Sequence, residues 1–121
     1  MDVEHQAEVG EVQGDRLRAA RELAQRYRAV VVVKGSGTVV AVAGEAPRIN
    51  ATGSAALASA GTGDVLAGWI GGRWAGSPVA SAVDVATRAV IEHGAAADPE
   101  APGAIRAGDL IEELYRRSRR A

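Results

Sequence analysis

The sequence has 121 residues, which is enough for one domain, and its 14 basic and 15 acidic residues leave a formal net charge of -1. This balance argues against a basic nucleic-acid-binding protein, and no apolar run reaches the roughly 18–20 residues of a membrane-spanning helix. The absence of cysteine excludes disulfide scaffolds, cysteine zinc sites and cysteine nucleophiles. We therefore expect a soluble, cytoplasmic protein with no nucleic-acid or membrane partner, and we assign no metal-ligating residues.

The apolar residues are mostly small. Hydrophobic residues make up 47% of the chain, but 26 of them are alanine and 15 valine, and phenylalanine is absent. Small side chains bury little apolar area, and each Å² is worth only ~25 cal/mol. The sequence therefore predicts a thin core for a domain that stands alone.

The first half of the chain predicts one helix and three short strands. Apolar spacing favours a helix over residues 15–28, capped by Asp15. Its buried stripe is expected to consist of Leu17, Ala20, Ala24 and Tyr27. Valine-rich runs predict strands over residues 29–33 and 38–43, and a third strand is expected over residues 47–50. The uninterrupted apolar character of the first strand indicates burial on both faces.

Three helices are expected in the second half. One runs from the 61–64 segment to residue 75, and one begins at Ser77-Pro78, an N-cap followed by proline, and ends near residue 97. The last begins at Asp109, with Glu112 as its capping-box partner. The apolar faces are expected to bury Trp69, Trp74, Val79, Leu110, Ile111 and Leu114. His93 is expected to be a packed, hydrogen-bonded histidine.

This order of elements defines the fold class. One helix, three short strands and three further helices make an α/β protein. Three strands form too small a sheet for so many helices, so the pattern is typical of part of a larger α/β sandwich. Gly68, Gly71 and Gly72 are spaced so that a neighbouring backbone is expected to pack closely against the helix.

The segment Gly61-Thr62-Gly63-Asp64 is the strongest candidate site. Glycines permit a tight turn, and the helix that follows directs unpaired N–H groups and a partial positive charge outward, which favours a phosphate or oxyanion. A carboxylate at Asp64 could take a proton from an attacking hydroxyl. The alternative is an ordinary aspartate that stabilises the first helical turn.

A second candidate is the loop of Lys34, Gly35, Ser36, Gly37 and Thr38. A strand follows it, so it is not a Walker A loop, which a helix follows. Lys34 is nevertheless the only lysine, against 13 arginines. The alternative is a hairpin turn with a surface lysine. Asn50-Ala51-Thr52-Gly53 could line a nucleotide site, and His5 and Glu8 could bind a ligand, or both could be ordinary surface.

Taken in order, these motifs resemble a known family. A valine-rich strand entering Lys-Gly-x-Gly-Thr, then Asn-x-Thr-Gly, then Gly-Thr-Gly-Asp-Val-Leu-Ala-Gly is similar to the ADP-dependent NAD(P)H-hydrate dehydratases of the ribokinase-like superfamily. The resemblance implies a partial ribokinase-like sandwich in which residues 1–121 are the C-terminal portion of the dehydratase domain.

The resemblance also implies roles. The substrate would be hydrated NADH or NADPH, the phosphoryl donor ADP or ATP, and Mg²⁺ would assist. Asp64 would be the base, and Gly61, Thr62 and Gly63 the anion hole. Residues 34–38 would border the nucleotide. His5 would contact the substrate, although His5-Gln6-Ala7-Glu8 stands where the family has His-Pro-Gly-Glu.

The length of the match leaves alternatives open. Because the resemblance covers only the C-terminal portion of the family domain, a homo-oligomer or a missing N-terminal half would complete the site. The chain could instead be an inactive nucleotide-binding fragment or pseudoenzyme. A ribokinase-like kinase for small alcohols is a third possibility, because such kinases share the Gly-x-Gly-Asp turn.

Overall fold

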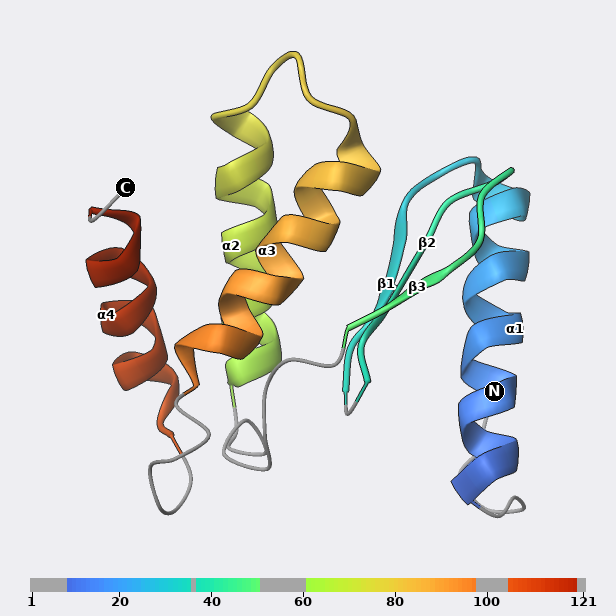
Figure 1. The fold of residues 1–121 in the computed structure, drawn as a ribbon, viewed down its shortest axis with the longest axis horizontal. Helices are drawn as coiled ribbons and strands as arrows, with labels where there is room; N and C mark the ends of the chain where they lie inside the picture. The colour runs from blue at the N-terminus through green and yellow to red at the C-terminus, as the bar shows by residue number, and fades with distance from the viewer. Residues whose placement is uncertain (1–8, 36, 51–60, 98–104, 120–121) are drawn as a thin grey trace.

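A computed structural model describes residues 9–35, 37–50, 61–97 and 105–119 (Figure 1). The elements are α1 (Val9–Tyr27), β1 (Val31–Val33), β2 (Val39–Ala41), β3 (Arg48–Ile49), α2 (Thr62–Ala75), α3 (Ala82–Ala96) and α4 (Ala107–Ser118). The predicted α/β class, with short strands followed by three helices, is confirmed. The first helix begins earlier than the expected residue 15.

The sheet is antiparallel in the order β1-β2-β3, with Val32 opposite Val40 and Val40 opposite Arg48. Side chains of β2 alternate between its two faces. Val39 and Ala41 pack against Ala20 and Ala24 of α1. Val40 points the other way, into a cluster with Leu66, Val83, Ala86 and Val90 of α2 and α3. The central strand is therefore buried on both faces.

The helices form layers on either side of this sheet. In Figure 1, α1 covers one face, α2 and α3 lie on the opposite side, and α4 lies beyond them. Leu110 and Leu114 hold α4 in place by packing with Ala96 of α3 and, around the edge of that cluster, with Val65 and Trp69 of α2. The largest fully buried side chains are one leucine and three valines, as a thin core requires.

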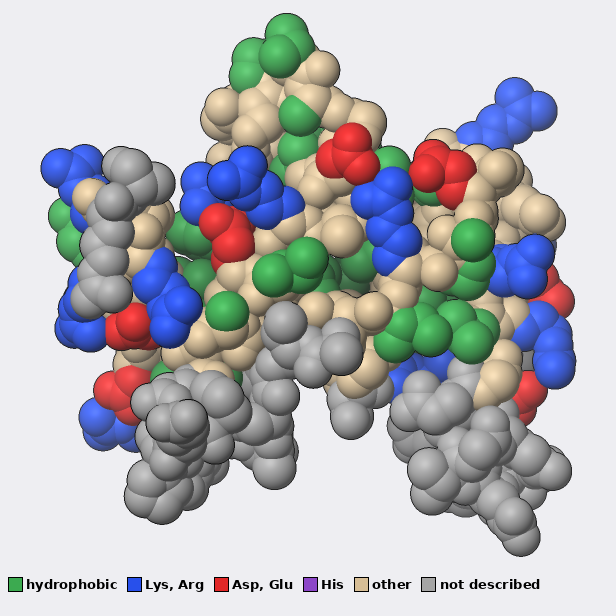
Figure 2. All heavy atoms as spheres, in the orientation of Figure 1, with side chains coloured by type: hydrophobic (Ala, Val, Ile, Leu, Met, Phe, Trp, Pro, Cys, Tyr) green, Lys and Arg blue, Asp and Glu red, His purple; other side chains and the backbone are tan. Residues whose placement is uncertain are grey.

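Polar contacts join the layers as well. Glu92 of α3 accepts hydrogen bonds from Trp69 Nε1 at 3.1 Å and from Arg73 Nε at 3.0 Å. Arg48 of β3 donates to the Asp84 carboxylate of α3 at 3.0 Å. On the face drawn in Figure 2, acidic and basic side chains lie beside one another. Within the part of the chain that the structure describes, no helix is long and apolar enough to cross a membrane.

Several predicted core residues are on the surface. Tyr27 is 65% exposed and Trp74 57% exposed, because no described element covers the helix faces that carry them. Val79 is 99% exposed because residues 77–80 form a turn and α3 begins only at Ala82. Its cap is Ser81, whose side-chain oxygen accepts a hydrogen bond from the Asp84 N–H at 3.2 Å.

The start of α4 also differs from the prediction. The helix begins at Ala107, and Asp109 pairs back to Arg106 rather than forward to Glu112. This shift leaves Leu110 and Leu114 buried as expected, but Ile111 faces outward and is 53% exposed.

The expectation for the glycines in the body of α2 is wrong. A Cβ atom at Gly68, Gly71 or Gly72 would meet no described atom within 4 Å. Among the described residues, no backbone approaches these positions, so no close helix packing is present there.

Candidate active site

The turn before α2 depends on glycine. Gly61 is the N-cap of α2 and has φ 88°, a left-handed conformation that side chains other than glycine rarely adopt. A Cβ atom at this position would lie 3.3 Å from the Cβ of Ala107 in α4. Both the backbone angle and the close neighbour therefore favour glycine here.

The first turn of α2 has the features of an anion site. Its N-cap, Gly61, has no side chain that could accept a hydrogen bond. The first N–H groups of an α-helix point away from its body and have no partner within the helix. The Val65 N–H closes the turn on the Gly61 carbonyl at 3.1 Å. Asp64, the acidic residue of this turn, is exposed to solvent. Partial positive charge, outward N–H groups and one accessible carboxylate thus meet at a single point.

Lys34 brings the second candidate segment to this turn. Its ammonium nitrogen donates to the Gly63 carbonyl at 3.3 Å, across 29 residues of sequence. A Cβ atom at Gly63 would lie 3.3 Å from the same nitrogen. The structure therefore places the only lysine of the chain at the edge of the glycine turn.

The loop after Lys34 is held by its neighbours. Gly35 and Gly37 have φ values of 140° and 67°. Thr38 is buried and donates from Oγ1 to the Gly35 carbonyl at 2.9 Å. Arg16 of α1 donates to the carbonyls of Val33 and Lys34 at 3.2 and 3.3 Å. Sequence reasoning missed Arg16, because the periodicity of a helix does not indicate which distant carbonyl a long side chain will reach.

His93 reaches the turn from α3. Its Nε2 lies 2.9 Å from the Thr62 carbonyl oxygen, and the side chain is only 7% exposed. Burial disfavours the charged ring and lowers the pKa of His93 from its ordinary 6.5, an effect that the hydrogen bond to Thr62 opposes. The prediction of a packed, hydrogen-bonded histidine is confirmed, and its partner lies within the candidate site.

Other predicted site residues are only partly described. The Asn50 backbone N–H donates to the Thr38 carbonyl at 2.8 Å, and its side chain donates to the Val90 carbonyl at 3.4 Å. Asn50 therefore joins the end of β3 to the 34–38 loop and to α3. His5, Glu8, Ser36, Thr52 and Gly53 lie outside the described residues.

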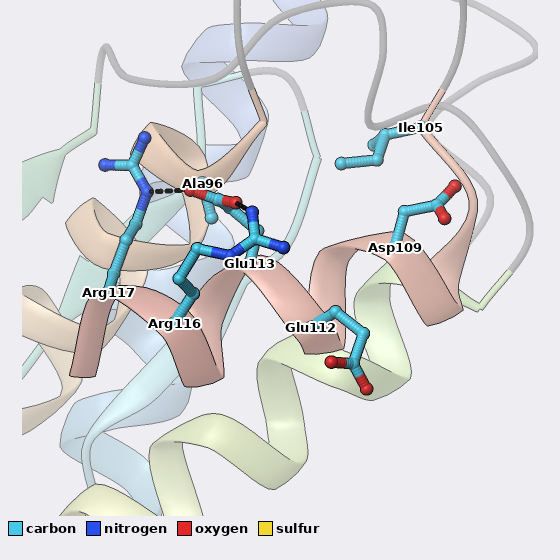
Figure 3. Close-up of a pocket in the computed structure, with 7 residues that line it drawn as sticks. All are labelled: Ala96, Ile105, Asp109, Glu112, Glu113, Arg116 and Arg117. Atoms are coloured by element: carbon cyan, nitrogen blue, oxygen red, sulfur yellow. Dashed lines mark hydrogen bonds and ion pairs between the residues drawn. The ribbon is translucent and has the colours of Figure 1, made fainter. Parts of the chain in front are cut away.

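A separate hollow of about 480 Å³ runs along α4. It is lined by Ala96, Ile105, Asp109, Glu112, Glu113, Arg116 and Arg117 (Figure 3). Arg116 and Arg117 both point to the Glu113 carboxylate, at 2.6 and 3.0 Å, so one carboxylate is shared by two guanidinium groups. The hollow contains none of the predicted site residues, and its chemistry does not single out a ligand. Among the described residues, no group of three acidic or histidine side chains could hold a metal ion.

The fold and this turn define a class of protein. A glycine turn that opens a helix, with a lysine beside it, presents N–H groups and a cation to the same point. Such sites in α/β proteins are typical of the binding of nucleotide phosphates. The family model described as NAD(P)H-hydrate dehydratase matches residues 4–118. The chain belongs to the NAD(P)H-hydrate dehydratase family.

Relatives agree with this assignment. The chain is 43% identical over 107 residues to the bifunctional NAD(P)H-hydrate repair enzyme of Escherichia coli (strain K12), covering 88% of this chain and 20% of that protein. It is 43% identical over 109 residues to the ADP-dependent (S)-NAD(P)H-hydrate dehydratase of Neisseria meningitidis, covering 88% and 36%.

A solved structure is similar over nearly all of the chain. The ADP/ATP-dependent NAD(P)H-hydrate dehydratase from Bacillus subtilis, co-crystallized with ATP/Mg²⁺, is 34% identical with a TM-score of 0.76, covering 93% of this chain and 41% of that chain. The fold is thus part of the dehydratase fold. The chain spans 20% to 41% of the length of these three relatives.

Proposed function

We propose that residues 1–121 form the C-terminal portion of a dehydratase domain and supply the nucleotide-binding and catalytic-base part of ADP- or ATP-dependent repair of hydrated NADH or NADPH. The observation that carries this proposal is the 3.3 Å approach of Lys34 to Gly63, which joins the two predicted motifs at one helix start. The family match over residues 4–118 supports the substrate class.

The proposed reaction has two stages. Asp64 accepts the proton of the hydroxyl on the hydrated nicotinamide ring, and the resulting oxygen attacks the terminal phosphorus of the nucleotide. The bond from that phosphorus to its bridging oxygen breaks, so ADP leaves AMP and a phosphorylated hydrate. Loss of inorganic phosphate and a ring proton then restores the dihydronicotinamide.

The turn would stabilise the charge that develops on the phosphoryl group. N–H groups at the start of α2 would face it, and the fold would fix their direction before the substrates bind, which is what electrostatic stabilisation of a transition state requires. Lys34 and the rest of the 34–38 loop would border the nucleotide. The exposure of Asp64 leaves it accessible to a bound substrate.

Mg²⁺ would enter with the nucleotide. Mg²⁺ in nucleotide sites is usually held by phosphate oxygens, water and one or two carboxylates, so the nucleotide itself would supply most of its ligands. The ion would neutralise charge on the phosphates. His5 as a substrate contact and a cytoplasmic location stay predictions from the sequence. A homo-oligomer or a separate N-terminal portion of the domain would supply the rest of the pocket.

The test is recovery of the absorbance of reduced nicotinamide from the hydrate, with ADP and Mg²⁺. The assay uses this chain together with the remainder of the domain from the Neisseria relative, supplied in trans. Asp64→Asn should lower turnover by at least about a hundredfold, the usual contribution of a general base. Asp84→Asn is the matched control, because Asp84 is also in the first turn of a helix but pairs with Arg48.

Each outcome separates the alternatives. ADP binding by calorimetry without any turnover would favour a pseudoenzyme. Phosphorylation of a small alcohol in place of the hydrate would favour the kinase. Equal activity of Asp64→Asn and the unaltered chain would refute the role of Asp64.

A further inference from the structure

The three backbone carbonyls of the glycine turn all have donors. The Gly61 carbonyl accepts from the Val65 N–H at 3.1 Å, and the Gly63 carbonyl from Lys34 Nζ at 3.3 Å. The Thr62 carbonyl, between them, lies 2.9 Å from His93 Nε2. Two of these donors are side chains from other elements, so tertiary contacts add to the helical hydrogen bonds that orient the turn.

His93 differs from Lys34 in its surroundings. The lysine is exposed, whereas the histidine is buried and belongs to α3, which packs along α2. A carbonyl oxygen can only accept a hydrogen bond, so Nε2 of His93 must carry the proton of this contact. Because His93 is buried, its N–H cannot exchange the Thr62 carbonyl for a water molecule unless the side chain leaves its packed position.

Peptide geometry carries the effect of His93 to the other side of the turn. The Thr62–Gly63 peptide bond is trans, like the others among the described residues, so the Thr62 C=O and the Gly63 N–H point in opposite directions from one rigid plane. Holding the carbonyl therefore fixes the direction of the N–H. This plane joins Thr62 to Gly63 in the first turn of α2, and Gly61 and Gly63 on either side of Thr62 leave the backbone few steric restraints. The contact with His93 adds a side-chain restraint from another helix to this first turn.

We propose that His93 is a positioning residue of the anion site, which holds the Thr62 carbonyl so that the Gly63 N–H faces the transferring phosphoryl group. The identity of that group rests on the proposed function. The contact between His93 Nε2 and the Thr62 carbonyl, here called the His93 clamp, rests on the hydrogen bond alone. His93 does not touch the phosphate and takes no proton from the substrate. It acts by ordering the turn before the nucleotide arrives, so that binding does not have to immobilise two glycines.

Two substitutions separate the hydrogen bond from packing. His93→Leu removes the donor but still fills the buried position with a side chain. His93→Gln keeps an N–H donor at about the same reach as Nε2. Val83→Ala is the control for loosened packing, because Val83 lies at the opposite end of α3 in the cluster with Leu66 and Val40.

The affinity of the 121-residue chain for Mg²⁺-ADP is measured by calorimetry, with thermal unfolding of each variant alongside. His93→Leu should weaken binding about tenfold, the equivalent of roughly one hydrogen bond. His93→Gln should recover most of this loss, and Val83→Ala should change stability with little change in affinity. No rescue by glutamine, or an equal loss of affinity in Val83→Ala, would overturn the inference.

A second measurement does not depend on the nucleotide. In the free chain, ¹⁵N relaxation of the Gly63 amide should show increased motion in His93→Leu and unaltered motion in His93→Gln. An unchanged Gly63 amide in His93→Leu would overturn the clamp even if ADP binds. Failure of the unaltered chain to bind ADP, with Gly63 still ordered by His93, would refute the proposed function and leave the clamp established.

Discussion

Gly61 stands at the start of α2 and Gly71 in its body, and the two positions have opposite requirements. At Gly61 the backbone is left-handed and Ala107 of α4 leaves little room for a side chain. At Gly71 the helix is regular and a Cβ atom would meet nothing within 4 Å among the described residues. A glycine-rich helix therefore does not have one explanation. Only the glycines of the turn are tied to the geometry of the candidate site.

The largest expected effect is that of Gly61→Ala. A left-handed conformation costs a residue with a Cβ atom roughly 1–2 kcal/mol, and the contact with Ala107 adds to it. The free energy of unfolding, measured in urea, should fall by about that amount. Affinity for ADP should fall as well, because the first turn of α2 would move. A neutral result would mean that the turn adapts and would remove the contrast with Gly71.

Acidification tests the second contact that holds the turn, the hydrogen bond between His93 and the Thr62 carbonyl. The pKa of His93 is lowered from 6.5 in the folded chain, so below about pH 6.5 the unfolded chain takes up the proton first. The free energy of unfolding should therefore fall with decreasing pH, by at most ~1.4 kcal/mol per pH unit, and be fully recovered above about pH 6.5. His93→Gln should lack this component. Comparing the two chains cancels the contributions of His5 and the carboxylates.

Gly71→Ala should act in the opposite direction to Gly61→Ala. Alanine is favoured over glycine within a helix by about 1 kcal/mol, and no described neighbour would be displaced. Thermal unfolding should shift upward with affinity for ADP unchanged. A destabilised chain would indicate that something packs against this face of α2 after all.

The smallest expected effect is that of Gly63→Ala. Its Cβ atom would lie 3.3 Å from Lys34 Nζ, and a flexible ammonium can move aside at little cost. Stability should hardly change. The lysine would lose its place on the Gly63 carbonyl, however, so affinity for ADP should fall about threefold, an effect of less than one hydrogen bond. An unchanged affinity would separate Lys34 from the nucleotide site.

Most of the fold was predictable because local pattern and tertiary packing agree. Valine runs made both β1 and β2 recognisable, and Leu110 and Leu114 were assigned correctly to the core. Periodicity identifies an apolar stripe but not whether another element covers it, so Trp74 was placed wrongly. The cap of α3 was predicted at Ser77 because proline follows it, whereas the structure uses Ser81.

The candidate site was predictable only in its parts. The residue types at 61–64 indicate an anion-binding turn, and the rarity of lysine drew attention to Lys34. That these segments meet, and that His93 and Arg16 hold them, follows from contacts between residues 17 to 31 positions apart. Such contacts leave no local pattern in one sequence. The roles of these residues in chemistry stay predictions.

The hydrogen bond between His93 and Thr62 also bears on how the site comes into being. A synthetic peptide of residues 61–75 would contain the whole Gly-Thr-Gly-Asp motif but neither Lys34 nor His93, the two side chains that reach the turn from other elements. At this length, and with its glycines, it should be mostly unfolded in water. The motif is therefore not expected to keep its conformation when it is transferred alone to another protein. If the turn binds the anion as proposed, binding requires that α3 and the end of β1 have already packed against α2, so ligand binding would report on completed folding.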